Sequence, residues 1–314
     1  SLIGLVKPLL HIMLAAIILG TLGYLCAIFL TILAGQVIVH GLLTGAAGII
    51  VPVDNMWLAF IPVKTIITVM IVIAVLRGIL HYAEQYCNHF IAFKLLAIIR
   101  HKVFASLRKL CPAKLEGRDK GNLISIITTD IELLEVFYAH TISPIAIATL
   151  TSMVMVIFIG RYHWLAGMLA LAAYLIVGVA IPMWNGKRGS QKGMEFRTSF
   201  GELNSFVLDS LRGLDETIQY GQGEKRKEQM SERSKNLAGI QKSLSKMEGS
   251  QRSFTNMVIL LASFGMLALT IWLYDKGAIG FEGILTCTIA MMGSFGPVVA
   301  LSSLSNNLNQ TCLL

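Results

Sequence analysis

The sequence has few charged residues: Asp, Glu, Lys and Arg together make up only 14% of its 314 residues. Soluble domains carry about 25%, so this composition excludes an ordinary soluble enzyme or binding domain. Hydrophobic residues are abundant instead, at 55% of the chain, and the mean hydropathy is +0.69. The composition therefore indicates a membrane protein that crosses the bilayer several times.

Several catalytic signatures are also absent from the sequence. It contains no GxxxxGK[ST] phosphate-binding loop, no HExxH motif, no Ser-His-Asp arrangement and no paired carboxylates at usable spacing. We therefore expect that this chain alone neither binds nor hydrolyses ATP and is not an enzyme. Its five cysteines form no CxxC motif, which favours small buried side chains over a metal site, and no metal site is predicted.

The net charge of +8 follows from the positions of the basic residues and does not indicate a nucleic-acid partner. Of the 26 Lys and Arg residues, eight lie in residues 94–120 and thirteen in residues 187–252. Loops rich in Lys and Arg stay on the cytoplasmic side of a membrane. We therefore expect these two stretches, and both termini, on the cytoplasmic side of the cell inner membrane, with the short connections outside.

Hydrophobic runs divide the chain into six predicted spans, because about 20 apolar residues suffice to cross the bilayer core. Helical spacing of apolar residues continues beyond the charged ones, so the spans extend as helices into the cytoplasm. Pro182 is expected to bend the fourth span. The predicted fold class is all-α, with one domain over residues 1–314. Its predicted helices cover residues 8–40, 56–111, 124–160, 164–212, 223–274 and 281–314.

Six spans with two long cytoplasmic hairpins resemble the transmembrane half of a type I ABC exporter. In that family the hairpin tips are coupling helices that dock onto nucleotide-binding domains. The stretches DKGNLISIITTDIELLE and GLDETIQYGQGEK look like the two coupling regions. The resemblance implies that the coupling residues are Gly121, Asn122, Leu123 and Ile126 at the first tip, and Asp215, Glu216, Ile218 and Tyr220 at the second.

A narrower resemblance lies in the second span. The span contains Arg77, Tyr82, Glu84, His89 and Phe93, and Gly121-x-Leu123 and Ile142-Ser143-Pro144 follow downstream. This pattern is similar to that of CydC, one half of the heterodimeric CydDC exporters needed for assembly of cytochrome bd oxidase. CydC-type chains continue into an ATP-binding domain, so we expect this sequence to stop before one; a separate permease subunit is the alternative.

The CydC resemblance also implies cofactors and partners. His89 matches a histidine implicated in haem binding. We expect Tyr82 beside it to contact the haem, and Arg77, further along the helix, to pair with a propionate. A histidine that is hydrogen-bonded at the membrane boundary without a cofactor is the alternative. ATP and Mg²⁺ would bind only through an absent or partner nucleotide-binding domain. The expected partners are a second exporter half, CydD-like or identical, the nucleotide-binding domains and the lipid bilayer.

Four polar residues of the second span follow the spacing i, i+4, i+7 and i+11, which predicts that they share one helix face. They are Arg77, His81, Glu84 and Asn88. In a structural interpretation, Arg77 reaches the inner interface and Glu84 pairs with Arg77 or His81. In a functional interpretation, His81, Glu84 and Asn88 form the wall of a substrate cavity. Spacing alone does not separate the two.

These observations predict the membrane half of an ATP-driven exporter that works by alternating access. The resemblance implies small thiols such as cysteine or glutathione as cargo, with haem as further cargo or as cofactor. The alternatives are an exporter half for lipids, drugs or peptides, and a haem-binding assembly module without transport of its own.

Overall fold

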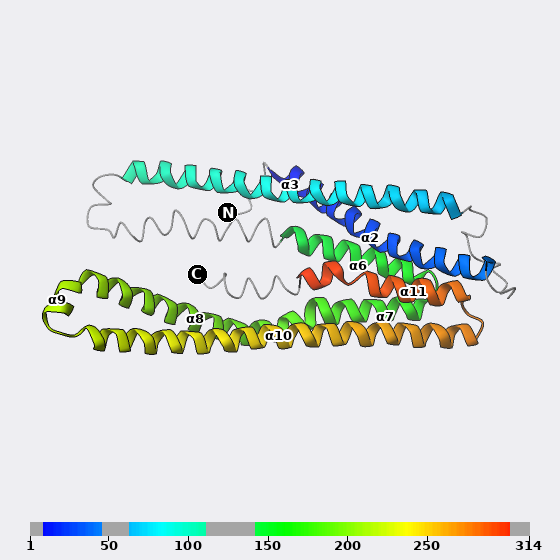
Figure 1. Cartoon of the computed structure of the whole chain (residues 1–314). Coiled ribbons are helices and arrows are strands. Elements are labelled where there is room, and N and C mark those ends of the chain that lie inside the picture. Colours follow the sequence, from blue (N-terminus) through cyan, green and yellow to red (C-terminus); the bar gives the residue numbers. More distant parts are fainter. Residues whose placement is uncertain (1–8, 46–62, 111–141, 302–314) are drawn as a thin grey trace. The chain divides into compact units, whose positions relative to one another are not determined.

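A computed structural model describes residues 9–45, 63–110 and 142–301 of the chain. In these ranges all regular elements are helices, which confirms the predicted all-α class (Figure 1). The elements are α2 (Leu10–Gly45), α3 (Val63–Leu110), α6 (Ser143–Gly160), α7 (Trp164–Leu175), the π-helical turn η4 (Ile176–Ala180), α8 (Ile181–Arg212), α9 (Leu214–Gln219), α10 (Gly223–Asp275) and α11 (Phe281–Gly293).

The described residues contain six helical segments that are long and apolar enough to cross a membrane. These segments are Leu10–Ile38, Lys64–Lys109, Ser143–Gly160, Trp164–Trp184, Gly223–Asp275 and Phe281–Leu301. The start of the predicted second span, residues 56–62, and the predicted first coupling region lie outside the described residues. Internal contacts divide the chain into two compact units. The first comprises α2, α3, α6, α7, α11 and the C-terminal part of α10, and the second comprises α8, α9 and the N-terminal part of α10.

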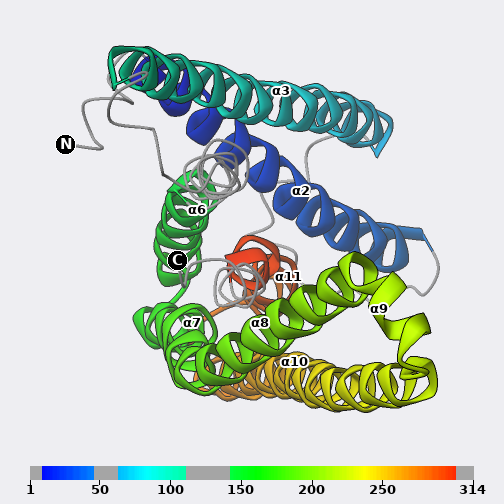
Figure 2. The ribbon, with the colours of Figure 1, turned by 90° about the vertical axis from the view of Figure 1, so that its left-hand side faces the viewer.

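In the first unit, α2 packs against α3, α6 and α11 (Figure 2). Two glycines of α2 make this possible, because a Cβ atom at Gly20 would overlap Ile147 of α6 and one at Gly35 would overlap Ile289 of α11. Residues without a side chain let helices approach closely inside membranes. Apolar clusters around Leu33 and Leu95 complete the contact between α2 and α3.

A tight turn joins α6 to α7. His163 caps α7, because its Nδ1 accepts a hydrogen bond from the Leu165 backbone N–H at 3.2 Å. Close to the turn the two helices touch through glycines: a Cβ atom at Gly167 would lie only 2.8 Å from the Cα atom of Gly160. The two helices therefore form an antiparallel hairpin.

Pro182 occupies the first turn of α8, directly after η4. Proline lacks a backbone N–H, and its ring collides with the carbonyl group four residues earlier. That carbonyl belongs to Gly178, in the middle of η4. The disturbance expected at Pro182 therefore takes the form of a π-helical turn that starts six residues before the proline.

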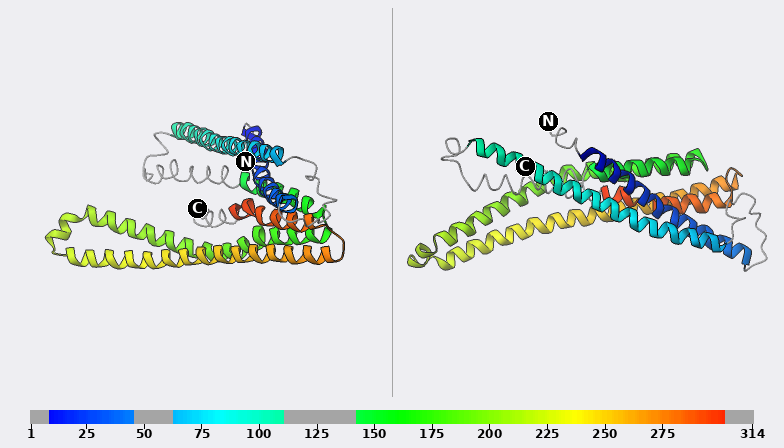
Figure 3. Two further views of the ribbon diagram at one scale, coloured as in Figure 1. Left: turned by 45° about the vertical axis from the view of Figure 1, so that its right-hand side comes forward. Right: turned by 90° about the horizontal axis from the view of Figure 1, so that it is seen from above.

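The second unit is a helical hairpin in which α9 connects α8 to α10 (Figure 3). Gly221 ends the tip with φ +62°, a left-handed conformation that glycine adopts without strain. Trp184 packs edge-to-face on Phe254, and Lys192 donates a hydrogen bond to Ser243. Nearer the tip, the guanidinium groups of Arg226 and Arg233 lie 5.0 and 4.8 Å from the ring centroid of Phe206.

Candidate functional site

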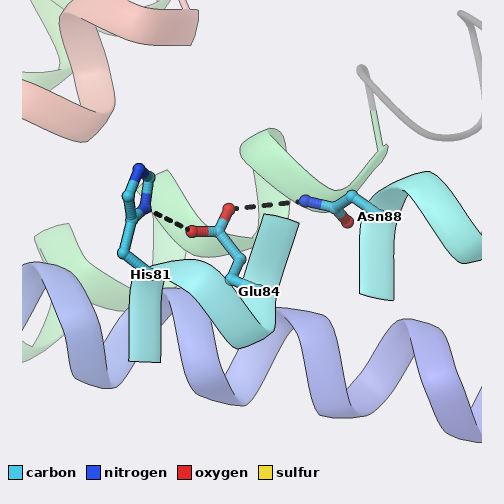
Figure 4. Close-up of polar contacts among 3 residues, drawn as sticks. All are labelled: His81, Glu84 and Asn88. Carbon is cyan, nitrogen blue, oxygen red and sulfur yellow. Dashed lines mark hydrogen bonds and ion pairs between the residues drawn. The ribbon is translucent and has the colours of Figure 1, made fainter. Parts of the chain in front are cut away.

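A polar cluster lies on α3 within the first unit (Figure 4). Glu84 is its centre: one carboxylate oxygen lies 3.2 Å from His81 Nδ1, and the other accepts a hydrogen bond from Asn88 Nδ2 at 3.4 Å. The three residues are one helical turn apart, so the helix itself brings them together. Glu84 and Asn88 are only 6% and 4% exposed, whereas His81 is exposed. The cluster therefore reaches from the surface of α3 into the packed interior.

The buried side of this cluster faces α2. A Cβ atom at Gly20 would lie 3.1 Å from the Glu84 carboxylate carbon, so a larger residue there would force the carboxylate to shift by a few tenths of an ångström. Tyr24, one turn further along α2, lies within electrostatic range of both Glu84 and Arg77. An acidic and a basic group therefore act on the same tyrosine. Ionisable groups inside a membrane protein are costly to bury and are usually functional.

The cluster keeps one unused hydrogen-bond acceptor. Asn88 Oδ1 is buried and has no hydrogen-bond partner among the described residues. A buried polar atom without a partner costs roughly 1–3 kcal/mol. This atom is therefore suited to receive a hydrogen bond from a bound molecule or from water.

The structure brings His81, Glu84 and Asn88 together, as their spacing predicts. It pairs Glu84 with His81, one of the two pairings considered from sequence. The predicted common face is divided, however, because Arg77 and His81 are exposed while Glu84 and Asn88 are buried. The cause is the close approach of α2 at Gly20, which covers only one edge of that face. The role of these residues as a substrate wall stays a prediction.

The predicted haem residues do not meet on one face of α3. Tyr82 is 73% exposed, and the exposed His89 ring stacks on Phe93 with 6.3 Å between ring centroids. Tyr82 and His89 are seven residues apart and share a face, but Arg77 points about 120° away from His89 around the helix. The three residues therefore do not fit haem as a set, and haem at His89 stays a prediction.

The second predicted coupling region forms the tip of the α8–α10 hairpin. Asp215 and Glu216 lie in the first turn of α9, where acidic side chains favour the helix N-terminus. Ile218 and Tyr220 are 70% and 71% exposed. An apolar surface at the end of a long hairpin is suited to docking a partner domain. The first-tip residues Gly121, Asn122, Leu123 and Ile126 lie outside the described residues.

Comparison with known proteins identifies this arrangement. A model of the ABC transporter transmembrane region matches residues 9–298. The chain belongs to this family. The transmembrane domain is thus that of an ABC exporter, a multi-pass membrane protein, as its helices and hairpins predict.

Several curated relatives share this domain. A probable ABC transporter ATP-binding/permease protein of Haemophilus influenzae is 41% identical over 311 residues, which cover 99% of this chain and 54% of that protein. The glutathione/L-cysteine transport system protein CydC of the same organism is 21% identical over 219 residues, or 70% and 37% of the two chains. The ATP-dependent lipid A-core flippase of Escherichia coli is 24% identical over 247 residues, or 76% and 40%.

The chain spans about half the length of the first of these relatives, and less of the other two. The resemblance to CydC is confirmed as a relationship within the exporter family. The identities to CydC and to the flippase are similar, so they do not select a cargo.

Sequence reasoning missed a second polar network of the ABC transporter domain, between α2, α11 and the α6–α7 turn. Gln36 is buried and donates a hydrogen bond to Thr286 Oγ1 at 3.1 Å. Tyr162 of the turn lies against α11 at Gly283, and burial, reinforced by the nearby Glu282, raises the pKa of Tyr162. Gln36 and Thr286 are uncharged and 250 residues apart, so a search for ionisable groups at helical spacing could not find them.

Proposed function

We propose that this transmembrane domain forms one half of a CydC-like exporter that moves small zwitterionic thiols such as cysteine or glutathione. The observation that carries the proposal is the buried Glu84 carboxylate with the unpartnered Asn88 Oδ1 beside it, and the opposite charge of Arg77 two turns earlier on α3. A zwitterion carries an ammonium and a carboxylate group, and each needs a partner of opposite charge in the low-dielectric interior of a membrane protein. The glutathione/L-cysteine systems among the relatives support the same cargo class.

In this proposal, ATP and Mg²⁺ bind to nucleotide-binding domains, carried by a longer form of this chain or by a partner. A second half, CydD-like or identical, completes the substrate pathway. Tyr24, Glu84 and Asn88 hold the ammonium group of the cargo, with Asn88 Oδ1 as an additional acceptor. The exposed tip around Ile218 receives the movement of a nucleotide-binding domain.

Replacing Glu84 by Gln tests the cargo site. We expect ATP-dependent uptake of cysteine or glutathione into inverted vesicles to fall at least about tenfold, because the amide removes the negative charge at nearly unchanged volume. Glu224→Gln is the matched control, since Glu224 is an exposed residue of the cytoplasmic hairpin. Equal uptake by Glu84→Gln and the parent protein would contradict the proposed site.

The proposal also places the α9 tip in the cytoplasm and the α10–α11 turn outside the inner membrane, with both termini cytoplasmic. The concentration of Lys and Arg in the hairpin regions supports this orientation. A cysteine at Gly221 should react with a membrane-impermeant maleimide only in inverted vesicles, and a cysteine at Lys276 only in intact cells. Labelling of position 221 in intact cells would refute the orientation.

A lipid exporter is the second candidate, favoured by the lipid A-core flippases among the relatives. The same vesicles distinguish the two. A lipid exporter would move a fluorescent phospholipid between leaflets without thiol uptake, and Glu84→Gln would leave that movement unchanged. Haem-related cargo or a haem-binding assembly role, which the resemblance implied, gains no support from the arrangement of Arg77, Tyr82 and His89.

A further inference from the structure

The first unit contains a cavity of about 480 Å³ that is separate from the polar cluster. Its walls come from three segments: residues 148–157 of α6, residues 171–179 of α7 and η4, and residues 298–301. The α6–α7 hairpin is closed near its turn by the contact of Gly160 with Gly167. The cavity lies further from that turn, along the remaining length of both helices.

Small side chains and the π-helical turn create this space. Ala148 and Ser152 line it from α6, and Gly178 lines it from η4. A Cβ atom at Gly178 would lie 3.0 Å from Val298 Cγ1, so the glycine lets the segment after α11 form the floor. π-helical turns occur frequently at functional sites. Here the turn forms part of the cavity wall.

The chemistry of the lining is that of hydrocarbon. The described residues that line the cavity include none with a charge. Two of its hydroxyl groups are already engaged: Tyr174 hydrogen-bonds Ser294, and Thr149 donates to the Ile145 carbonyl oxygen at 2.8 Å. Ser152 carries the one other hydroxyl among the described side chains of the lining, so the wall is overwhelmingly apolar. Apolar cavities of this kind stay dry and bind apolar molecules.

The rim and the volume of the cavity indicate what fills it. Met153, Ile157 and Leu175 line it and are largely exposed, so it opens on a surface of membrane-spanning helices. A transmembrane helix is about 10–12 Å wide, so roughly one of its turns would fill this volume. Such a helix needs more than five turns to cross the bilayer, so the cavity is too small to hold one. A single flexible hydrocarbon chain matches both the size and the chemistry.

We propose that this cavity binds one acyl chain of a membrane phospholipid. Lipid tails are as apolar as leucine, so the chain gains little from leaving the bilayer. An acyl chain in the cavity touches the protein on three sides. It therefore makes more van der Waals contacts than a lipid tail that lies against a convex helix surface. Because the walls belong to α6, to α7 with η4, and to the segment after α11, the bound chain connects three segments of the domain.

A photoreactive lipid tests this proposal in the full-length transporter. The transporter is reconstituted in nanodiscs with phosphatidylethanolamine that carries a diazirine in one acyl chain, and the labelled peptides are identified by mass spectrometry. We expect labelling in residues 148–157 and 171–179 to exceed labelling around Ile71, an exposed position of α3, by at least fivefold. Ser152→Phe and, from the opposite wall, Leu175→Trp should each reduce cavity labelling by at least fivefold.

The control is Ile71→Phe, which adds a similar ring at an exposed position of α3 without filling the cavity. Monodispersity in size-exclusion chromatography shows which variants fold, and two filling variants on different helices guard against misfolding of either one. Equal labelling of the cavity and of the Ile71 region would mean bulk lipid only and would overturn the proposal. So would cavity labelling that persists in both filling variants, or no cavity labelling because a partner half covers the site.

Discussion

Ile218→Asp in the full-length transporter should remove at least about 90% of substrate-stimulated ATP hydrolysis while the protein remains folded. Ile218 is 70% exposed at the α9 tip, so its replacement disturbs little inside this domain. If the tip docks on a nucleotide-binding domain, the substitution places a charge in an apolar contact, which is strongly unfavourable. A penalty of about 3 kcal/mol already weakens docking roughly 100-fold.

Gln219→Asp is the matched control for this experiment, because it adds the same charge to the neighbouring exposed position. Stimulated and basal ATP hydrolysis are compared in the same lipid, with thermal unfolding as the check on folding. Full stimulation in Ile218→Asp would exclude this tip as the transmission point. An equal loss in both variants would mean that added charge, not the contact made by Ile218, is responsible.

Gly167→Val should disrupt the α6–α7 hairpin. The new Cβ atom would lie 2.8 Å from the Gly160 Cα atom, and because that neighbour is backbone, one helix has to move. Overpacking of this kind typically costs about 1–3 kcal/mol, and the larger side chain adds to it. We therefore expect the apparent Tm of the purified protein to fall by at least about 5 °C, or the yield of folded protein to collapse.

Gly78→Val is the matched control, since a Cβ atom at Gly78 would meet no atom of the described part of the chain within 4 Å. Both glycines lie in membrane-spanning helices, so the two variants share the change in helix propensity. The apparent Tm of Gly78→Val should stay within about 2 °C of the parent. A similar decrease in both variants would show that valine in a helix, and not the contact with Gly160, causes the loss.

Much of the fold could be predicted because it depends on local signals. Uninterrupted apolar runs indicated the spans, and the break at Gly213–Gln222 indicated the second tip, where Gly221 adopts its left-handed conformation. Pro182 marked the place where regular helix is disturbed. Its form, a π-helical turn over Ile176–Ala180, depends on how the freed backbone groups find partners, which the residue type alone does not determine.

The candidate site was less predictable because it depends on contacts between distant parts of the chain. Helical spacing placed His81, Glu84 and Asn88 together, since these residues are one turn apart. Which of them is buried depends on Gly20, more than 60 positions earlier in the sequence. The hydrogen bond from Gln36 to Thr286 has no local signal at all, because it joins the first and last described membrane helices.

The two long arms of the α8–α10 hairpin differ in stiffness. α10 runs for 53 residues, about 80 Å, as one uninterrupted helix without proline. The other arm meets Pro182 and the π-helical turn, which lie in the candidate membrane span Trp164–Trp184, before it continues into α7, and such points are where helices bend. A displacement at the tip is therefore passed along α10 as by a rigid rod, whereas the arm through α8 absorbs part of it at a hinge. A force applied at the α9 tip would reach the α10–α11 turn with less loss than it reaches α7.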